Sequence, residues 1–137
     1  MSARKERTQI LVLGLTATVI FAAALMGGLV LQDYFSPILP RTRVTLLPNE
    51  GPFSFNGTNP VITVQPHTLV EILLVNTGLV EHDFVIDDFA VHLYPDVEPS
   101  HQGSVTFYAN RSGTYTYYCS VPGHRELGME GKLVILG

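Results

Sequence analysis

Apolar and polar residues alternate along several short stretches downstream of residue 43. In the run Val105-Thr106-Phe107-Tyr108-Ala109, the apolar residues Val105, Phe107 and Ala109 share one face of an extended strand. Similar stretches, separated by Pro, Gly, Asn or Asp, predict seven or eight strands. These are residues 44–47, 53–55, 61–64, 69–76, 82–86, 105–109, 114–119 and 132–136. Short strands at this spacing indicate an all-β sandwich or barrel.

The N-terminal end has a different pattern, because residues 10–31 carry no charged side chain. As a helix this stretch would be about 33 Å long, close to the thickness of a bilayer's hydrocarbon core. We therefore predict a single transmembrane helix at residues 10–31. Basic side chains among residues 1–9 place that end in the cytoplasm and the rest of the chain at the outer, periplasmic face. A cleaved signal peptide is the alternative, since three alanines at residues 22–24 resemble a cleavage site.

The chain after this segment divides into a stalk and one domain. Pro37 and Pro40 forbid a regular helix over residues 32–42 and predict a short, stiff stalk. Residues 43–137 are rich in Val, Thr, Tyr and Phe, which favours one all-β globular domain. The net charge of −4, without a basic run in this domain, excludes nucleic acid as a partner.

One stretch carries the candidate chemistry, in which Cys119, His124 and Met129 recur every five residues. A turn at Pro122-Gly123 and another at Gly128 would bring the three side chains to one point. Cys119 is the single cysteine, so the chain has no internal disulfide. The thiol is therefore a buried apolar group, a reactive group or a metal ligand.

Two histidines, one cysteine and a weak methionine are the donors of a blue-copper site. His82, which opens the predicted strand 82–86, is the candidate for the second histidine. Each residue alone is more often core filler or a solvated polar group. Their combination on a loop turned by glycine and proline predicts one copper ion per chain, cycling between Cu(I) and Cu(II).

These residues resemble the cupredoxin (blue copper) family. The segment GTYTYYCSVPGHRELGMEGKLVIL, residues 113–136, is similar to the copper-binding loop of cupredoxins, with a spacing similar to rusticyanin and auracyanin-type proteins. His-Asp-Phe-Val-Ile at 82–86 resembles the family's first-histidine strand. The resemblance implies a Greek-key β-sandwich and four copper ligands, His82, Cys119, His124 and the axial Met129. Asp83 stands where many members have an asparagine that steadies the cysteine loop.

The predicted anchor and β domain together also resemble cytochrome oxidase subunit II. A binuclear copper centre of that kind needs two cysteines four residues apart, and Gly123 occupies the second position, so we expect a mononuclear site. The resemblance implies a membrane-anchored protein that passes single electrons between haem or copper redox proteins or membrane complexes. We expect no enzymatic activity and no small-molecule substrate. A fixed accessory subunit of a larger respiratory or photosynthetic complex is the alternative.

The other histidines and the acidic residues suggest no second site. His67, His92 and His101 are flanked by turns, so we expect them to be solvated and not to bind a second copper ion. Six acidic residues are expected to form a surface band: Glu81, Asp83, Asp87, Asp88, Asp96 and Glu98. Such a band either steers a positively charged partner or is simply solvated.

Overall fold

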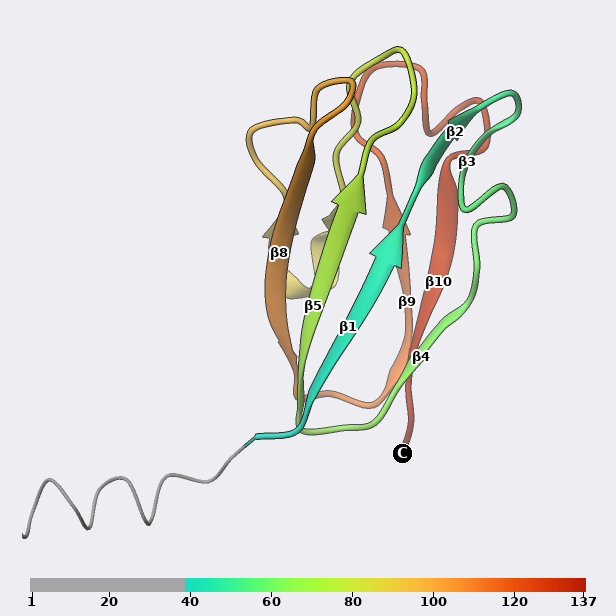
Figure 1. The fold of residues 1–137 in the computed structure, drawn as a ribbon. Coiled ribbons are helices and arrows are strands. Elements are labelled where there is room, and N and C mark those ends of the chain that lie inside the picture. The colour runs from blue at the N-terminus through green and yellow to red at the C-terminus, as the bar shows by residue number, and fades with distance from the viewer. Residues whose placement is uncertain (1–38) are drawn as a thin grey trace, which may run out of the picture. The chain divides into compact units, whose positions relative to one another are not determined.

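The computed structural model describes residues 39–137, which fold as a β-sandwich (Figure 1). The strands are β1 (Arg41–Leu46), β2 (Pro48–Glu50), β3 (Phe53–Phe55), β4 (Ile62–Val64), β5 (Thr68–Val75), β6 (Val85–Ile86), β7 (Val91–His92), β8 (Gln102–Ala109), β9 (Gly113–Tyr118) and β10 (Glu130–Ile135). A single 3-10 turn, η1 (Asp87–Phe89), lies between β6 and β7. The all-β prediction is confirmed.

Two sheets form the layers of the sandwich. In the order β1-β5-β8, the central strand β5 pairs in parallel with β1 and antiparallel with β8. The second sheet has the order β4-β10-β9-β6-β7, in which β10 is parallel to β4 and antiparallel to β9. Strands β2 and β3 form a separate two-stranded ribbon. Figure 1 shows the first sheet in front of β9 and β10.

The hydrophobic core lies between the sheets because the strands alternate as their sequences indicate. In β5, every second residue is buried, among them Val70 and Ile72. On β8, Phe107 and Ala109 are buried while Thr106 and Tyr108 are exposed, as predicted. The second sheet contributes buried side chains from β4, β9 and β10 to the same cluster. Apolar burial of this kind is the main force that holds two sheets together.

The strand predictions were wrong in two places. The predicted strand 82–86 is paired as β6 only at Val85–Ile86, and His82 forms an isolated bridge with Val97. Residues 82–86 are all buried, so the alternation of a half-exposed strand is absent there. Strands β2 and β7 were not predicted, because they have only three and two residues and lack an apolar run. The structure therefore has ten strands among residues 39–137, in place of seven or eight.

The two ends of the sandwich carry different parts of the chain. The loops that follow β2, β5 and β9 lie at one end, while β1 begins and the chain terminates at the other (Figure 1). Strand β1 begins at Arg41, so the last two residues of the predicted stalk belong to the sandwich. The predicted transmembrane helix at 10–31 lies outside the described residues, as do residues 1–9. Within residues 39–137, no helix has the length and apolarity needed to cross a membrane.

Tyr117 fills the centre of the second sheet's inner face. Its ring is fully buried between Phe55 and Phe84, at centroid distances of 5.5 and 5.3 Å, and its hydroxyl donates to the carbonyl of Pro60 at 2.6 Å. Gly131 lies directly opposite Tyr117 in the β9–β10 register. A Cβ atom at Gly131 would overlap Cζ of the tyrosine ring, so this position needs glycine.

We expect Gly131→Ala to lower the free energy of unfolding by about 1–3 kcal/mol, because the anchored Tyr117 ring has no space into which it can move. Urea denaturation followed by circular dichroism measures this change. In a Tyr117→Leu background the same substitution should cost less, because the overlapping ring atoms are absent. Equal costs in the two backgrounds would contradict the steric explanation.

Candidate metal centre

Three of the predicted ligands meet at the loop end of the sandwich. The ligand atoms of His82, Cys119 and His124 all lie within 4.8 Å of one another. The sulfur of Cys119 is 3.4 Å from Nδ1 of His124 and 3.9 Å from Nδ1 of His82. Both imidazoles thus turn Nδ1 toward the thiol. The two Nδ1 atoms and the sulfur are therefore three donors that surround one point.

Backbone turns in the β9–β10 loop bring the side chains of Cys119 and His124 together, as the sequence predicted. Gly123 and Gly128 have φ angles of +87° and +105°, which side chains with a Cβ rarely adopt. The amide of Cys119 donates to the carbonyl of Met129 at 3.1 Å, and the amide of Met129 donates to the carbonyl of His124 at 3.0 Å. The loop is therefore closed on itself by its own backbone.

Met129 lies inside this closed loop and is fully buried. Its backbone bonds to both Cys119 and His124, so its position in the chain suits a fourth donor. A thioether adds a weak ligand and carries no charge. The role of Met129 as the axial ligand stays a prediction.

Burial favours the uncharged forms of Cys119 and His82. It raises the pKa of the Cys119 thiol to about 12 and, together with the neighbouring His124, lowers the pKa of His82. Cys119 is buried and its raised pKa opposes ionisation, which argues against a reactive thiol. A cation that binds here must displace the thiol proton, after which the thiolate offsets one unit of the cation's positive charge.

The donor set fits copper. A thiolate and a thioether are soft ligands, and with two imidazoles they match the trigonal arrangement with a weak axial donor that proteins use for copper. The ligand atoms converge away from bulk solvent, because His82 and Cys119 are fully buried and His124 is 7% exposed. The residues present are thus sufficient for one copper ion.

Asp83 takes the place expected of the family's asparagine and steadies the cysteine loop. Its Oδ1 accepts a hydrogen bond from the amide of Ser120 at 2.6 Å, and its Oδ2 contacts the hydroxyl of Ser120. Nε2 of His92 lies 3.1 Å from the same Oδ2. Because Asp83 is fully buried, it is not part of the acidic surface band that the sequence predicted.

Two further residues lie around the site and were not predicted from the sequence. Glu50, at the end of β2, approaches Nε2 of His82 at 3.6 Å. Hydrogen bonds from the amides of Leu79 and Val80 lower the pKa of Glu50 below its usual value. Phe53 packs on His124 with ring centroids 4.5 Å apart. Both residues belong to the β2–β3 ribbon, about 30 residues before the first ligand, so no local spacing links them to the metal ligands.

The remaining histidines do not assemble into one site. His67 bonds to the hydroxyl of Tyr108, and His101 donates to the carbonyl of Pro99. His92 instead lies beside Asp83 and Asp96, where their ligand atoms are within 4.8 Å of one another. Within residues 39–137, no cluster unites all three histidines.

Comparison with known proteins supports copper as the cofactor. Residues 75–136 match the copper binding proteins of the plastocyanin/azurin family, and this range contains the four predicted ligands. The copper-resistant cuproprotein CopI of Rubrivivax gelatinosus is 30% identical, over 54% of this chain and 56% of that protein. The chain therefore spans about half the length of this curated relative.

Solved structures share this cupredoxin-like β-sandwich fold. Auracyanin B superposes with a TM-score of 0.56 at 21% identity, covering 74% of this chain and 93% of that one. A copper-containing nitrite reductase from Thermus scotoductus SA-01 gives 0.60 at 24% identity, and one from Nitrosomonas europaea gives 0.62 at 21%. Each of these matches covers 70% of this chain but only 28% and 41% of the respective enzyme. The same fold thus makes up nearly the whole of auracyanin B and one part of the longer nitrite reductases.

We expect Asp83→Ala to lower the unfolding free energy of the metal-free protein by about 2 kcal/mol, because the amide and hydroxyl of Ser120 lose a charged acceptor. Asp83→Asn should cost less, since its amide oxygen still accepts from the Ser120 amide. Urea denaturation of the three proteins without copper measures both effects. Wild-type stability in Asp83→Ala would show that the carboxylate does not hold the loop.

Proposed function

We propose that this chain is a membrane-anchored, mononuclear type 1 copper protein that carries single electrons between redox partners at the outer face of the membrane. The observation that carries the proposal is the buried convergence of two imidazoles and one thiol beside Met129. When bound, copper supplies a one-electron Cu(I)/Cu(II) couple. The chain holds it through His82, Cys119, His124 and Met129.

The surrounding residues favour electron transfer over catalysis. Four protein donors leave no open position for a substrate, and the closed hydrogen bonding of the ligand loop resists changes in ligand geometry. A site that keeps its shape in both oxidation states reorganises little, which speeds electron transfer. The copper enzymes of this fold in the comparisons are much longer chains, and we propose no enzymatic activity or small-molecule substrate for this one.

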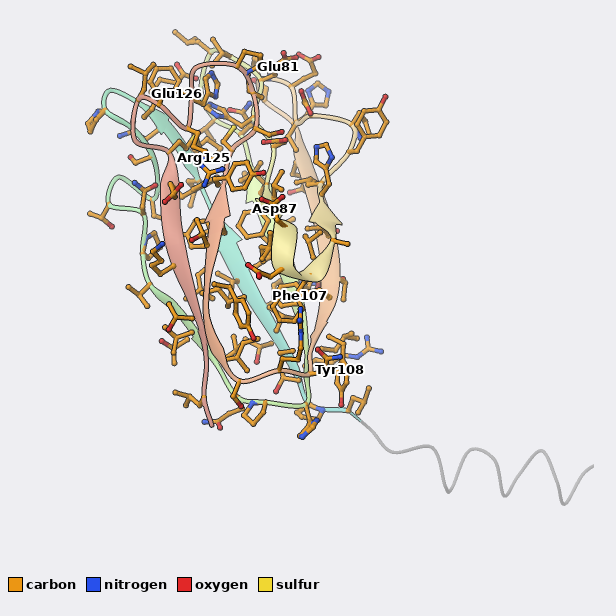
Figure 2. All side chains as sticks on the ribbon, turned by 180° about the vertical axis from the view of Figure 1, so that it is seen from behind. Glu81, Asp87, Phe107, Tyr108, Arg125 and Glu126 are labelled. Atoms are coloured by element: carbon orange, nitrogen blue, oxygen red, sulfur yellow. The ribbon has the colours of Figure 1, made fainter. Side chains whose placement is uncertain are left out.

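We propose that electrons pass through His124, the one predicted ligand with any solvent exposure. Leu127, on the same loop, is 60% exposed and offers apolar contact to a partner. Arg125 and Glu126 lie nearby at the same end of the sandwich, together with Glu81 from the loop between β5 and β6 (Figure 2). An apolar centre with charges at its rim suits a transient complex with a haem or copper redox protein.

The anchor is the uncharged stretch at residues 10–31, with residues 1–9 in the cytoplasm and the copper domain outside it. This arrangement would confine the carrier to the membrane surface. The same sequence would also suit a fixed accessory subunit of a larger complex.

A second candidate function is copper resistance, which the similarity to CopI of Rubrivivax gelatinosus favours. That function needs copper binding alone, whereas a carrier must also exchange electrons with a partner. Slow electron exchange with every redox protein of the same membrane, combined with tight copper binding, would favour resistance.

We expect the purified full-length protein to contain one copper ion and to show an intense visible charge-transfer band, which Cys119→Ser abolishes. The band requires a copper–thiolate bond, and the chain has no other thiol. Copper quantitation, absorption spectra and a redox titration of the wild type test this. The double variant Cys119→Ser/Ser120→Cys is the control, because its thiol sits one residue away and should not restore the band. A band in Cys119→Ser would overturn the site.

The anchor is tested by fractionating cells that express the full chain. We expect the wild type to stay in the membrane pellet after washes with salt and carbonate. Leu15→Arg with Val19→Arg should release it, because each charge at the helix centre opposes insertion by about 2.5–3.5 kcal/mol. The apolar pair Leu15→Ile with Val19→Leu is the control. A mature protein that begins after residue 24 and is free of membrane would contradict the anchor, and a constant assembly after gentle solubilisation would identify a fixed subunit.

A further inference from the structure

Glu50 reaches from the β2–β3 ribbon into the loop that precedes the first ligand. Its Oε1 accepts hydrogen bonds from the amides of Leu79 at 2.5 Å and Val80 at 3.0 Å. The side chain is only 23% exposed, although glutamate usually lies in solvent. Two backbone donors thus fix the carboxylate at one place beside His82.

His82 has one nitrogen without a partner. Nδ1 faces the sulfur of Cys119, so it is the nitrogen available to a metal. Nε2 is buried and has no hydrogen-bond acceptor within reach among residues 39–137. The carboxylate Oε1 of Glu50 lies 3.6 Å from it, just beyond hydrogen-bond distance. A buried donor without an acceptor is costly, so a small shift that closes this gap is favourable.

The loop after β5 has space for the carboxylate of Glu50. A Cβ atom on Gly78 would collide with Oε1 of Glu50. The Asn76 side chain accepts from the amide of Gly78 at 2.9 Å and donates to the carbonyl of Val80 at 2.7 Å. Asn76 is itself almost fully buried. The absence of a side chain at Gly78 therefore lets the carboxylate lie against the loop.

We propose that Glu50 is a positioning residue for His82: the Glu50 carboxylate accepts a hydrogen bond from Nε2–H of His82 and thereby keeps Nδ1 free to bind copper. This rests on the proposed copper site. A ligand imidazole that donates its second N–H to a carboxylate is held in one tautomer and orientation, and becomes a stronger donor. The negative charge also favours Cu(II) over Cu(I), so Glu50 lowers the reduction potential.

A structural role limited to the loop is the competing explanation, and Glu50→Gln separates the two. The glutamine oxygen still accepts from Leu79 and Val80, but the negative charge is absent. Removing such a partner typically weakens metal binding by about 10–100-fold. We expect the Cu(II)-to-Cu(I) ratio at a given applied potential to fall about tenfold, which is a rise of about 59 mV in the potential. A role limited to the loop predicts no change.

Glu81→Gln is the matched control, because it removes one exposed negative charge next to His82 in the sequence. Its effect should be much smaller, since solvent and salt screen an exposed charge. Gly78→Ala displaces the carboxylate without changing the charge of the chain, so it should raise the potential as Glu50→Gln does. The double variant Glu50→Gln/Gly78→Ala should shift the potential little more than either single substitution, because both remove the same contact between the Glu50 carboxylate and His82.

The measurements use the full-length protein in detergent, with circular dichroism to verify folding and spectroelectrochemical titration of the visible band. Potentials of Glu50→Gln and Gly78→Ala that shift no more than that of Glu81→Gln would overturn the proposal. NMR of ¹⁵N-labelled histidine in the metal-free wild type gives a second test that needs no variant. A proton on Nε2 of His82 there supports the proposal, and a neutral His82 with its proton on Nδ1 overturns it. A wild type that binds no copper would instead refute the proposed function.

Discussion

A buried carboxylate joins the two stretches of chain that carry the predicted metal ligands. Asp83 follows His82 directly and binds the amide of Ser120, which follows Cys119, across 37 residues of sequence. A carboxylate in the interior is unfavourable unless its oxygens are paired, and here both oxygens have partners. The chain can satisfy this buried charge only when the cysteine loop is in place. The position of the ligands therefore follows from the requirement to pair one acid.

The ligand loop adds a second level of order through its own backbone. Its backbone hydrogen bonds link Cys119, His124 and Met129, and its two glycines allow the reversals between them. Burial then suppresses charge on the thiol and on His82. The result is a preformed cluster of donors in which little needs to move when a cation replaces the thiol proton.

The sequence predicted the parts of the site that depend on local spacing. The five-residue repeat of Cys119, His124 and Met129, with glycines at the turns, was sufficient to place the ligand loop, and alternation was sufficient to identify the core face of β8. The contacts of Glu50 and Phe53 were not predictable, because they depend on how the β2–β3 ribbon packs against distant loops. The burial of Asp83 was missed for the same reason. Its charge suggested a surface residue, whereas its partners become visible only in the folded chain.

The sheet β1-β5-β8 supplies none of the four predicted ligands, and its outward side chains, such as Arg43 and Thr106, are exposed. Substitutions there alter the surface of the domain without touching the predicted ligands, which lie in the loops after β5 and β9. This face is therefore where the domain can be changed, or joined to further chain, with least disturbance of the site. In the two nitrite reductases the same fold is one part of a longer chain.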